Sequence, residues 1–517
     1  MPIPNTRPAE KLSATSYLNV KTLLAFGLLI HFGFGYLLTL SVDEAHYVMY
    51  AAIPAWSYFD HPPLVGWIQW PLVALDAPDS IIRLIPQLLW LAVCFLAREL
   101  AFNLYDRQHE RLSQAGVERE AVGLWAIGLV LLAPLMHVLA VGLLPDSLLM
   151  ILVLLLMQVT MQLTATRLDS GDLNKRHAWS KWLALGLLFG LAGLSKYTAV
   201  LPALAVIVAL LAGRGLRILL TPGPWLALIV ALLLISPVLI WNAQHEWISF
   251  VYQLKHGSGG TWHARRLAAF AGIQLVAYGP LLVFGAYLAT REVIQSKQWQ
   301  LAPLLLFFFI PFLVTALMSG GGGSLPHWTA PAWLAMTPFA ALALAQRWAS
   351  GRRALLLAFI RAQVVVCLVA FAALFFVGIP GLSPDHPLIR KNPLADLWGW
   401  DEAGLKAREL ARIHHLNSLS VRNWTLGSRL AWYARPLPVH VLDTRFDQFD
   451  LWFGQIPPGT DSLFVNWSQV KFELPTKAGE FKECRLMDTF EAKRFGRQVS
   501  RFDFYHCRQW GTSRNAQ

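Results

Sequence analysis

The chain has 517 residues, of which 56% are hydrophobic and only 14% are charged. About a quarter of the residues of a soluble globular domain are charged, so this composition excludes an ordinary water-soluble protein. The formal net charge is +12, but Lys and Arg lie in short segments between apolar runs. That placement is typical of membrane topology and not of a nucleic-acid surface, so we expect a membrane protein without a nucleic-acid partner.

Eleven apolar runs are candidates for membrane spans, since a helix needs roughly 20 apolar residues to cross the bilayer. The polar residues 1–19 lack the pattern of a cleaved signal peptide, so we expect the first run to remain as an anchor. The fifth and sixth runs are separated only at Lys196, and one kinked helix there would reverse every later segment. The runs are 20–40, 81–101, 121–140, 147–165, 181–195, 197–212, 223–241, 266–290, 299–319, 329–347 and 354–379.

Positive charge is distributed very unevenly between the two sets of connecting segments. The loops 41–80, 141–146, 242–264 and 319–328 contain Lys255 as their only Lys or Arg. Membrane proteins keep Lys and Arg on the cytoplasmic side, so we expect these four loops to lie outside. An odd number of spans then places the C-terminus outside as well. The sequence predicts a multi-pass membrane protein.

The composition changes near residue 380. We expect residues 1–380 to form the transmembrane domain, with 41–80 as its first outer loop, and 381–517 to form a small α/β domain outside the membrane. Alternating residues at 438–442 and 462–465 predict strands, and residues 423–435 place Leu426, Leu430 and Tyr433 on one helical face.

Two of the four cysteines lie in this C-terminal part. Cys484 and Cys507 are expected outside, where cysteines often pair, whereas Cys94 and Cys367 lie in apolar runs. The sequence leaves open whether the first two are bridged.

Several motifs, in the same order along the chain, resemble glycosyltransferase family 39. That family includes bacterial relatives of the protein O-mannosyltransferases and of the lipid A aminoarabinose transferase. The resemblance implies a GT-C membrane fold, a polyprenyl-phosphate-linked sugar donor and an active site at the outer membrane surface. The motifs are Asp43-Glu44 with Tyr47, 56–63 (WSYFDHPP), 144–149 (LPDSLL), 195–198 (SKYT) and 325–328 (LPHW).

The acids at the start of the first outer loop are the candidate catalytic residues. A sugar that leaves from a polyprenyl phosphate departs as a stabilised anion, so transfer needs one base for the acceptor hydroxyl and no general acid. The resemblance assigns this base to Asp43, with Glu44 second. From the residues alone, a helix N-cap is the favoured role for each acid.

Lys196 is the candidate contact for the donor phosphate. It lies in the apolar stretch 190–198, where an ammonium group is costly without an anionic partner, and the resemblance places a phosphate-binding lysine here. The alternative is a lysine that extends to the membrane interface. The resemblance also assigns Asp146, Tyr197 and His327 to the acceptor pocket. From the sequence alone, the favoured role of Asp146 is to cap the helix that begins at Ser147. The family's lysine before the Leu-Pro of 325–328 is here Ser324.

The resemblance further suggests that Asp60 ligates a divalent cation and that His61 contacts the phosphate. His256 is the suggested second metal ligand, with an exposed loop histidine as the alternative. One Asp and one His far apart are a weak metal signal on their own.

Two classes of function agree with these features. The first is an enzyme that moves a sugar from a polyprenyl-phosphate donor to an outward-facing acceptor, either lipid A, another envelope glycan or a protein. The second is a transporter or flippase of polyprenyl-linked glycans, in which the same residues would bind cargo. Transporters often show matching halves with interrupted helices, and this sequence shows no such repeat, which favours the enzyme.

Overall fold

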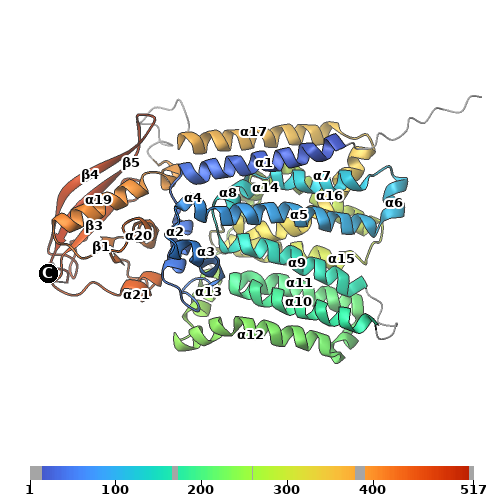
Figure 1. The fold of residues 1–517 in the computed structure, drawn as a ribbon, viewed down its shortest axis with the longest axis horizontal. Coiled ribbons are helices and arrows are strands. Elements are labelled where there is room, and N and C mark those ends of the chain that lie inside the picture. Colours follow the sequence, from blue (N-terminus) through green and yellow to red (C-terminus); the bar gives the residue numbers. More distant parts are fainter. Residues whose placement is uncertain (1–13, 166–172, 259, 379–390, 512–517) are drawn as a thin grey trace, which may run out of the picture.

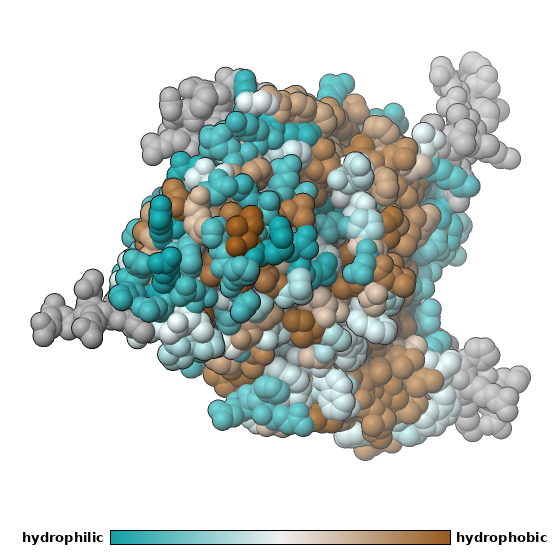
Figure 2. Space-filling model, turned by 60° about the vertical axis from the view of Figure 1, so that its left-hand side comes forward, coloured by the Kyte–Doolittle hydropathy of each residue, from teal (hydrophilic) through white to brown (hydrophobic). Residues whose placement is uncertain are grey.

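The computed structural model describes residues 14–165, 173–258, 260–378 and 391–511, with side chains except at 14–19, 173–178 and 256–258. Long helices lie side by side in a bundle, and the C-terminal strands and helices form a smaller body at one end of it (Figure 1). Hydrophilic residues gather over that body, whereas hydrophobic residues cover much of the bundle (Figure 2).

The bundle confirms a polytopic helical membrane protein. Among the described residues, nine helices are long and apolar enough to cross a membrane, and the bent pair α7 and α8 adds a tenth. The expected number was eleven. The remaining run, 181–195, lies in α10, whose apolar part Trp179–Ser195 is shorter than the other spans. The helices are α1 (Ala14–Leu37), α5 (Leu84–Asp106), α7 (Arg119–Leu131), α8 (Pro134–Val141), α9 (Pro145–Ala165), α10 (Leu173–Ser195), α11 (Val200–Arg214), α12 (Pro222–Gln244), α14 (Ala264–Gln295), α15 (Ala302–Gly321), α16 (Ala330–Ala349) and α17 (Ala354–Phe376).

The predicted single span 121–140 consists of two helices, α7 and α8, bent by 69°. Ala133 has an extended backbone, and Pro134 occupies the first position of α8. Proline has no amide hydrogen, and its ring disfavours the helical conformation in the residue before it. The dipeptide Ala133-Pro134 therefore ends one helix and begins the next.

A glycine face on α10 fixes the position of Lys196. A Cβ at Gly190 would lie 2.5 Å from Cβ of Leu234 on α12, and one at Gly193 would lie 2.6 Å from Cδ1 of Ile235. Small residues at this spacing let two membrane helices approach closely. After α10 ends, Lys196 has an extended backbone and the chain continues through a short 3-10 turn into α11. The runs 181–195 and 197–212 are therefore two elements, as predicted.

Short helices lie at the end of the bundle that faces the C-terminal body (Figure 1). They come from the first loop and from the segment after α12. They are α2 (Val42–Ala52), α3 (Leu64–Ala74), α4 (Asp79–Ile82) and α13 (Ile248–Ser258).

The C-terminal body is built on a five-stranded sheet with the order β2-β1-β3-β5-β4. β1 is parallel to β2 and β3, whereas β5 is antiparallel to β3 and β4. Cys484 and Cys507 face each other on β4 and β5 and form a disulfide, whereas Cys94 and Cys367 are free and buried. The elements are α19 (Trp400–Ile413), β1 (Leu419–Val421), α20 (Trp424–Tyr433), β2 (Val439–Val441), α21 (Gln448–Phe453), β3 (Ser462–Trp467), β4 (Glu483–Arg494) and β5 (Arg497–Arg508).

The predicted strands at 438–442 and 462–465 correspond to β2 and β3, and the predicted helix within 423–435 is α20. The expected domain boundary near residue 380 lies in 379–390, outside the described residues.

The C-terminal body and the first loop share one hydrophobic core. Buried Val48 and Met49 of α2 belong to the same cluster as Leu419 of β1 and Leu430 of α20. Hydrogen bonds tie the same surfaces together. Tyr433 donates its hydroxyl to Asp79 at 2.6 Å and accepts from the Leu40 amide at 2.7 Å. The end of the bundle that carries the first loop is thus closed by the C-terminal body.

Candidate active site

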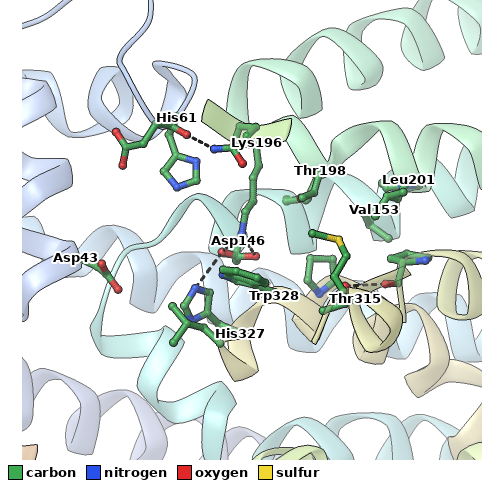
Figure 3. A pocket seen from close by; sticks show the side chains of 18 of the residues that line it. Asp43, His61, Asp146, Val153, Lys196, Thr198, Leu201, Thr315, His327 and Trp328 are labelled. Carbon is green, nitrogen blue, oxygen red and sulfur yellow. Dashed lines mark hydrogen bonds and ion pairs between the residues drawn. The ribbon is translucent and has the colours of Figure 1, made fainter. Parts of the chain in front are cut away.

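A cavity of about 260 Å³ lies where α2, the first loop, α9, α11, α15 and the C-terminal body meet. One end is polar and the other is apolar (Figure 3). The polar side chains are Asp43, His46, Tyr47, Asp60, His61, Asp146, Lys196, Tyr252, Gln253 and His327. The apolar side chains include Leu149, Val153, Leu201, Pro202, Phe307, Pro311, Met318 and Leu325.

Asp43 lines the polar end from the first turn of α2. Ser41, and not Asp43, is the N-cap of this helix, so the alternative role of Asp43 as a cap is excluded. Its carboxylate has no hydrogen bond or ion pair with the residues that the structure describes. Burial raises the pKa of Asp43 to about 6, and the nearby Asp396, Asp60 and Asp146 add to this, against the opposing effect of His46. A free carboxylate with a pKa near neutrality is suited to act as a base.

Glu44 lies outside the cavity lining and has two structural partners. Its carboxylate accepts from the Ser41 amide at 3.0 Å, which completes a capping box. It also forms a buried, two-pronged ion pair with Arg83, with N–O distances of 2.7 and 2.9 Å. Arg83 in turn donates to the carbonyls of Gly35, Leu38 and Thr39 at the end of α1. Glu44 thus anchors α2 to α1, and Asp43 is the acid that reaches the cavity.

Lys196 and Asp146 form a second buried ion pair, at the middle of the cavity (Figure 3). Nζ lies 2.7 Å from both carboxylate oxygens, and the two residues are 6% and 1% exposed. Lys196 is therefore not a lysine that extends to the membrane interface. Asp146 supplies the anionic partner that a buried ammonium group requires. His327 adds a longer contact, with Nε2 3.8 Å from Asp146.

Asp60 is held in place from two directions. One carboxylate oxygen, Oδ1, accepts a short hydrogen bond from the Tyr50 hydroxyl and lies 3.4 Å from His46 Nε2. The Asp60 carbonyl accepts from Gln253 Nε2 at 2.6 Å. Burial alone would raise the pKa of Asp60, but His46 and the hydrogen bonds outweigh it and leave the pKa below its usual value. Asp60 is therefore ionised at neutral pH.

His61 lines the same end, and its Nδ1 is buried without a hydrogen-bond partner among the described residues. Burial lowers the pKa of His61 to about 4, although Asp60 opposes the shift. At neutral pH the ring is uncharged, so it offers a phosphate an N–H donor and not the permanent charge of a lysine.

Tyr197, like Glu44, is not among the described residues that line the cavity. The Tyr197 hydroxyl lies 3.3 Å from Ser57 Oγ, and its ring packs against Phe250, while Thr198 lines the cavity instead. The side chain of His256 lies outside the described residues.

The divalent cation stays a prediction. Within the described residues, no three His, Cys, Asp or Glu side chains come together as a metal site. Asp60, the first suggested ligand, has Oδ1 committed to Tyr50 and His46. No step of the chemistry below depends on a metal.

The structure also brings in residues that the sequence analysis missed. His46 and Tyr50 follow Asp43 at three and seven residues on one face of α2, a spacing that could have revealed them. Trp424 lines the cavity from α20 of the C-terminal body. No local pattern links Trp424 to a loop almost 400 residues earlier, so only the fold shows this contact.

Comparisons with known proteins agree with this arrangement. Residues 60–241 match the family model described as dolichyl-phosphate-mannose-protein mannosyltransferase. The fold is similar to the crystal structure of ArnT from Cupriavidus metallidurans in the apo state, with a TM-score of 0.56, 14% identity, and coverage of 88% of this chain and 93% of that chain. The structure of the same ArnT bound to undecaprenyl phosphate gives a TM-score of 0.57 at 14% identity and covers 95% and 98%. No curated protein matches the chain in sequence.

Proposed function

We propose that this chain, a membrane glycosyltransferase of the dolichyl-phosphate-mannose-protein mannosyltransferase type with the fold of ArnT, moves one sugar from a polyprenyl-phosphate donor to an acceptor outside the membrane. The observation that carries the proposal is the two-ended cavity, in which an apolar wall adjoins Lys196 and a free, base-like Asp43. The apolar wall would contact a prenyl chain, and Lys196 would contact its phosphate. Asp43 would contact the hydroxyl of the acceptor sugar. ArnT has been crystallised with undecaprenyl phosphate bound.

Asp43 supplies the base in this reaction. It takes the proton of the acceptor hydroxyl while the acceptor oxygen bonds to the anomeric carbon of the donor sugar. The bond between that carbon and the phosphate oxygen breaks, and the electron pair leaves with the polyprenyl phosphate. The leaving phosphate is already a stable anion, so one base suffices.

Lys196 is the proposed contact for the donor phosphate, with His61 as a neutral N–H donor beside it. Charge that develops on a leaving group in a poorly solvated place is stabilised by a cation fixed beforehand. Asp146 neutralises Lys196 when no phosphate is bound. Asp146 and His327 then remain to contact the acceptor.

The sidedness follows from charge and redox chemistry. The first loop and the segments around the cavity contain almost no Lys or Arg, which favours the outer side of the bacterial inner membrane. The bridge between Cys484 and Cys507 suits an oxidising compartment at the same end of the molecule. We propose lipid A or another envelope glycan, ahead of protein, as the acceptor.

The test uses purified protein and a polyprenyl-phosphate sugar, and measures the free polyprenyl phosphate that appears. Asp43→Asn should lower kcat at least about a hundredfold, because a general base contributes roughly 10² to 10⁴. The melting temperature should not fall, since the substitution removes a buried, uncompensated charge. Asp401→Asn, on an exposed turn of α19, is the matched control.

The pH profile provides the second readout. The base must be unprotonated, so the wild-type rate should fall about tenfold per unit as pH drops below about 6. Full activity in Asp43→Asn would remove Asp43 from the mechanism.

A protein that moved polyprenyl-linked sugars across vesicles without releasing polyprenyl phosphate would instead be a flippase. Mass spectrometry of envelope lipids and glycans from a strain without the gene would name the sugar and acceptor.

A further inference from the structure

A serine of the C-terminal body reaches into the first loop. Ser428 lies on α20, and its Oγ is 3.2 Å from Nδ1 of His46 on α2. The other ring nitrogen of His46 faces Asp60 Oδ1 at 3.4 Å. Both Ser428 and His46 are buried, at 0% and 4% exposure. The three side chains form a chain of contacts from the C-terminal sheet domain to the polar end of the cavity.

The number of hydrogens on each group decides which atoms donate and which accept in these contacts. The Ser428 hydroxyl donates its only hydrogen to the Trp424 carbonyl at 2.9 Å, so its oxygen is an acceptor toward His46. The carboxylate of Asp60 is also an acceptor, and it already receives the Tyr50 hydroxyl. His46 therefore lies between two acceptor oxygens, one on Ser428 and one on Asp60.

The ring of His46 is also enclosed. Trp424 and Trp452 of the C-terminal body lie with centroids 5.5 Å from it, and Tyr50 of α2 lies at 5.2 Å. The aromatic rings surround the imidazole without a polar contact of their own, so its two polar contacts set which ring nitrogen faces Asp60. His46 in turn fixes one oxygen of Asp60. The second oxygen, Oδ2, has no hydrogen-bond partner among the described residues.

We propose that Ser428 is a positioning residue: through His46 it holds Asp60 with one carboxylate oxygen directed to the substrate, so that the C-terminal body completes the active site. The inference rests on the proposed function, since Asp60 lies at the end of the cavity where sugar and phosphate would meet. Its consequence is that a substitution in the C-terminal body slows transfer without touching any group that contacts substrate.

The test compares three serine variants in the full-length protein. Ser428→Ala should lower kcat for polyprenyl-phosphate sugar about tenfold or more. The reason is that a small misplacement of a group at the reaction site, here Asp60, lowers the rate up to about a hundredfold. Binding of polyprenyl phosphate and the melting temperature should stay near wild type. Ser428→Thr keeps the hydroxyl and should retain most of kcat. Ser420→Ala is the matched control, since Ser420 is also fully buried in the same sheet domain, but its hydroxyl has no hydrogen-bond partner in the part of the chain that the structure describes.

A double-mutant cycle separates positioning from folding. In a His46→Gln background the chain of contacts is already cut, so adding Ser428→Ala should cause no further loss of kcat. Additive losses, together with a fall in melting temperature, would assign Ser428 to folding and overturn the proposal. Ser428→Ala that turned over as fast as Ser420→Ala would also overturn it, while leaving the proposed function intact. A wild-type protein that released no polyprenyl phosphate would overturn both.

Discussion

At the scale of single residues, Lys196 and Asp146 form a buried ion pair, so a substitution at either position changes both stability and any substrate contact. Removing one partner of a buried ion pair leaves the other as an uncompensated charge, which costs about 3–5 kcal/mol. A single variant therefore mixes the loss of a substrate contact with a loss of stability.

We expect Lys196→Met to weaken polyprenyl-phosphate binding and to lower the melting temperature together. The double variant Lys196→Met with Asp146→Asn removes both charges, so it should recover the melting temperature while binding stays weak. Lys196→Arg keeps the charge and should retain part of the binding, although its geometry differs. Thermal unfolding and a direct lipid-binding assay on the same preparations give the two readouts.

If the double variant bound polyprenyl phosphate as tightly as wild type, Lys196 would have a structural role only. The phosphate contact would then have to come from another side chain of the cavity, such as His61 or His327.

The sequence predicted the burial of Lys196 but not the ion pair that it forms, and the reason is physical. The apolar neighbours of Lys196 predicted its burial, but its partner Asp146 lies 50 residues earlier and no periodic pattern joins the two. Adjacent acids such as Asp43 and Glu44 project from α2 in different directions, so only one of them reaches the cavity. Which one does so depends on where Arg83 lies, and that is a property of the packing of α1, α2 and α5.

At the scale of elements, α2 is held by its two ends and by one face. Ser41 and Glu44 cap its start, and Arg83 joins Glu44 to the last carbonyls of α1. His46 and Tyr50 on its other side reach Asp60. The helix thus carries Asp43 into the cavity, and it is held by a charge pair that lies outside the cavity lining.

We expect Glu44→Gln to lower the melting temperature by several degrees, because Arg83 loses its buried counter-charge. A second change, Arg83→Gln, should recover part of that loss and part of the activity. A catalytic acid would behave differently, since no change at Arg83 could restore it. Turnover measured well below the melting temperature of each variant separates the two roles, and an inactive, fully stable Glu44→Gln would return Glu44 to the catalytic residues.

Elements with strong local signals were predicted well. Apolar length located the bundle helices, and alternation located β2 and β3. The bend between α7 and α8 was missed because hydropathy continues unbroken across Ala133-Pro134, while the backbone does not. The short helices α2, α3 and α13 give weak periodic signals, and their positions depend on tertiary contacts with the C-terminal body and the bundle.

At the scale of the whole molecule, the charge asymmetry makes a prediction about orientation. The C-terminal body and α2 lie at one end of the bundle, and α6 (His109–Gln114) lies at the other (Figure 1). Asp43 of α2 and Trp424 of the C-terminal body both line the cavity. Lys471 and Ser113 are exposed at these two ends. The two native thiols that are not bridged, Cys94 and Cys367, are buried.

An impermeant thiol reagent added to intact cells should therefore label Lys471→Cys and leave Ser113→Cys unlabelled. Membrane disruption should expose Ser113→Cys, and the protein without an added cysteine should stay unlabelled throughout. Labelling of Ser113→Cys alone from outside would invert the orientation and move the transfer reaction to the cytoplasmic side.

Sequence patterns could not predict that the C-terminal body closes the site, for a general reason. The C-terminal body shares one hydrophobic core with α2, although the two segments lie almost 400 residues apart in the sequence. Contacts between such distant segments leave no local periodicity. Composition predicted that residues 381–517 are folded and polar. It gave no sign that Trp424 and Ser428 would reach the cavity.

The shared core also has a consequence for biogenesis. Val48 and Met49 are synthesised early, but part of the core that they belong to, including Leu419 and Leu430, leaves the ribosome only near the end. Until then the early members of that core, such as Leu40 and Val73, cover α2 only in part. The core around α2 is consequently completed last, and a truncated product of translation would lack the C-terminal share of it.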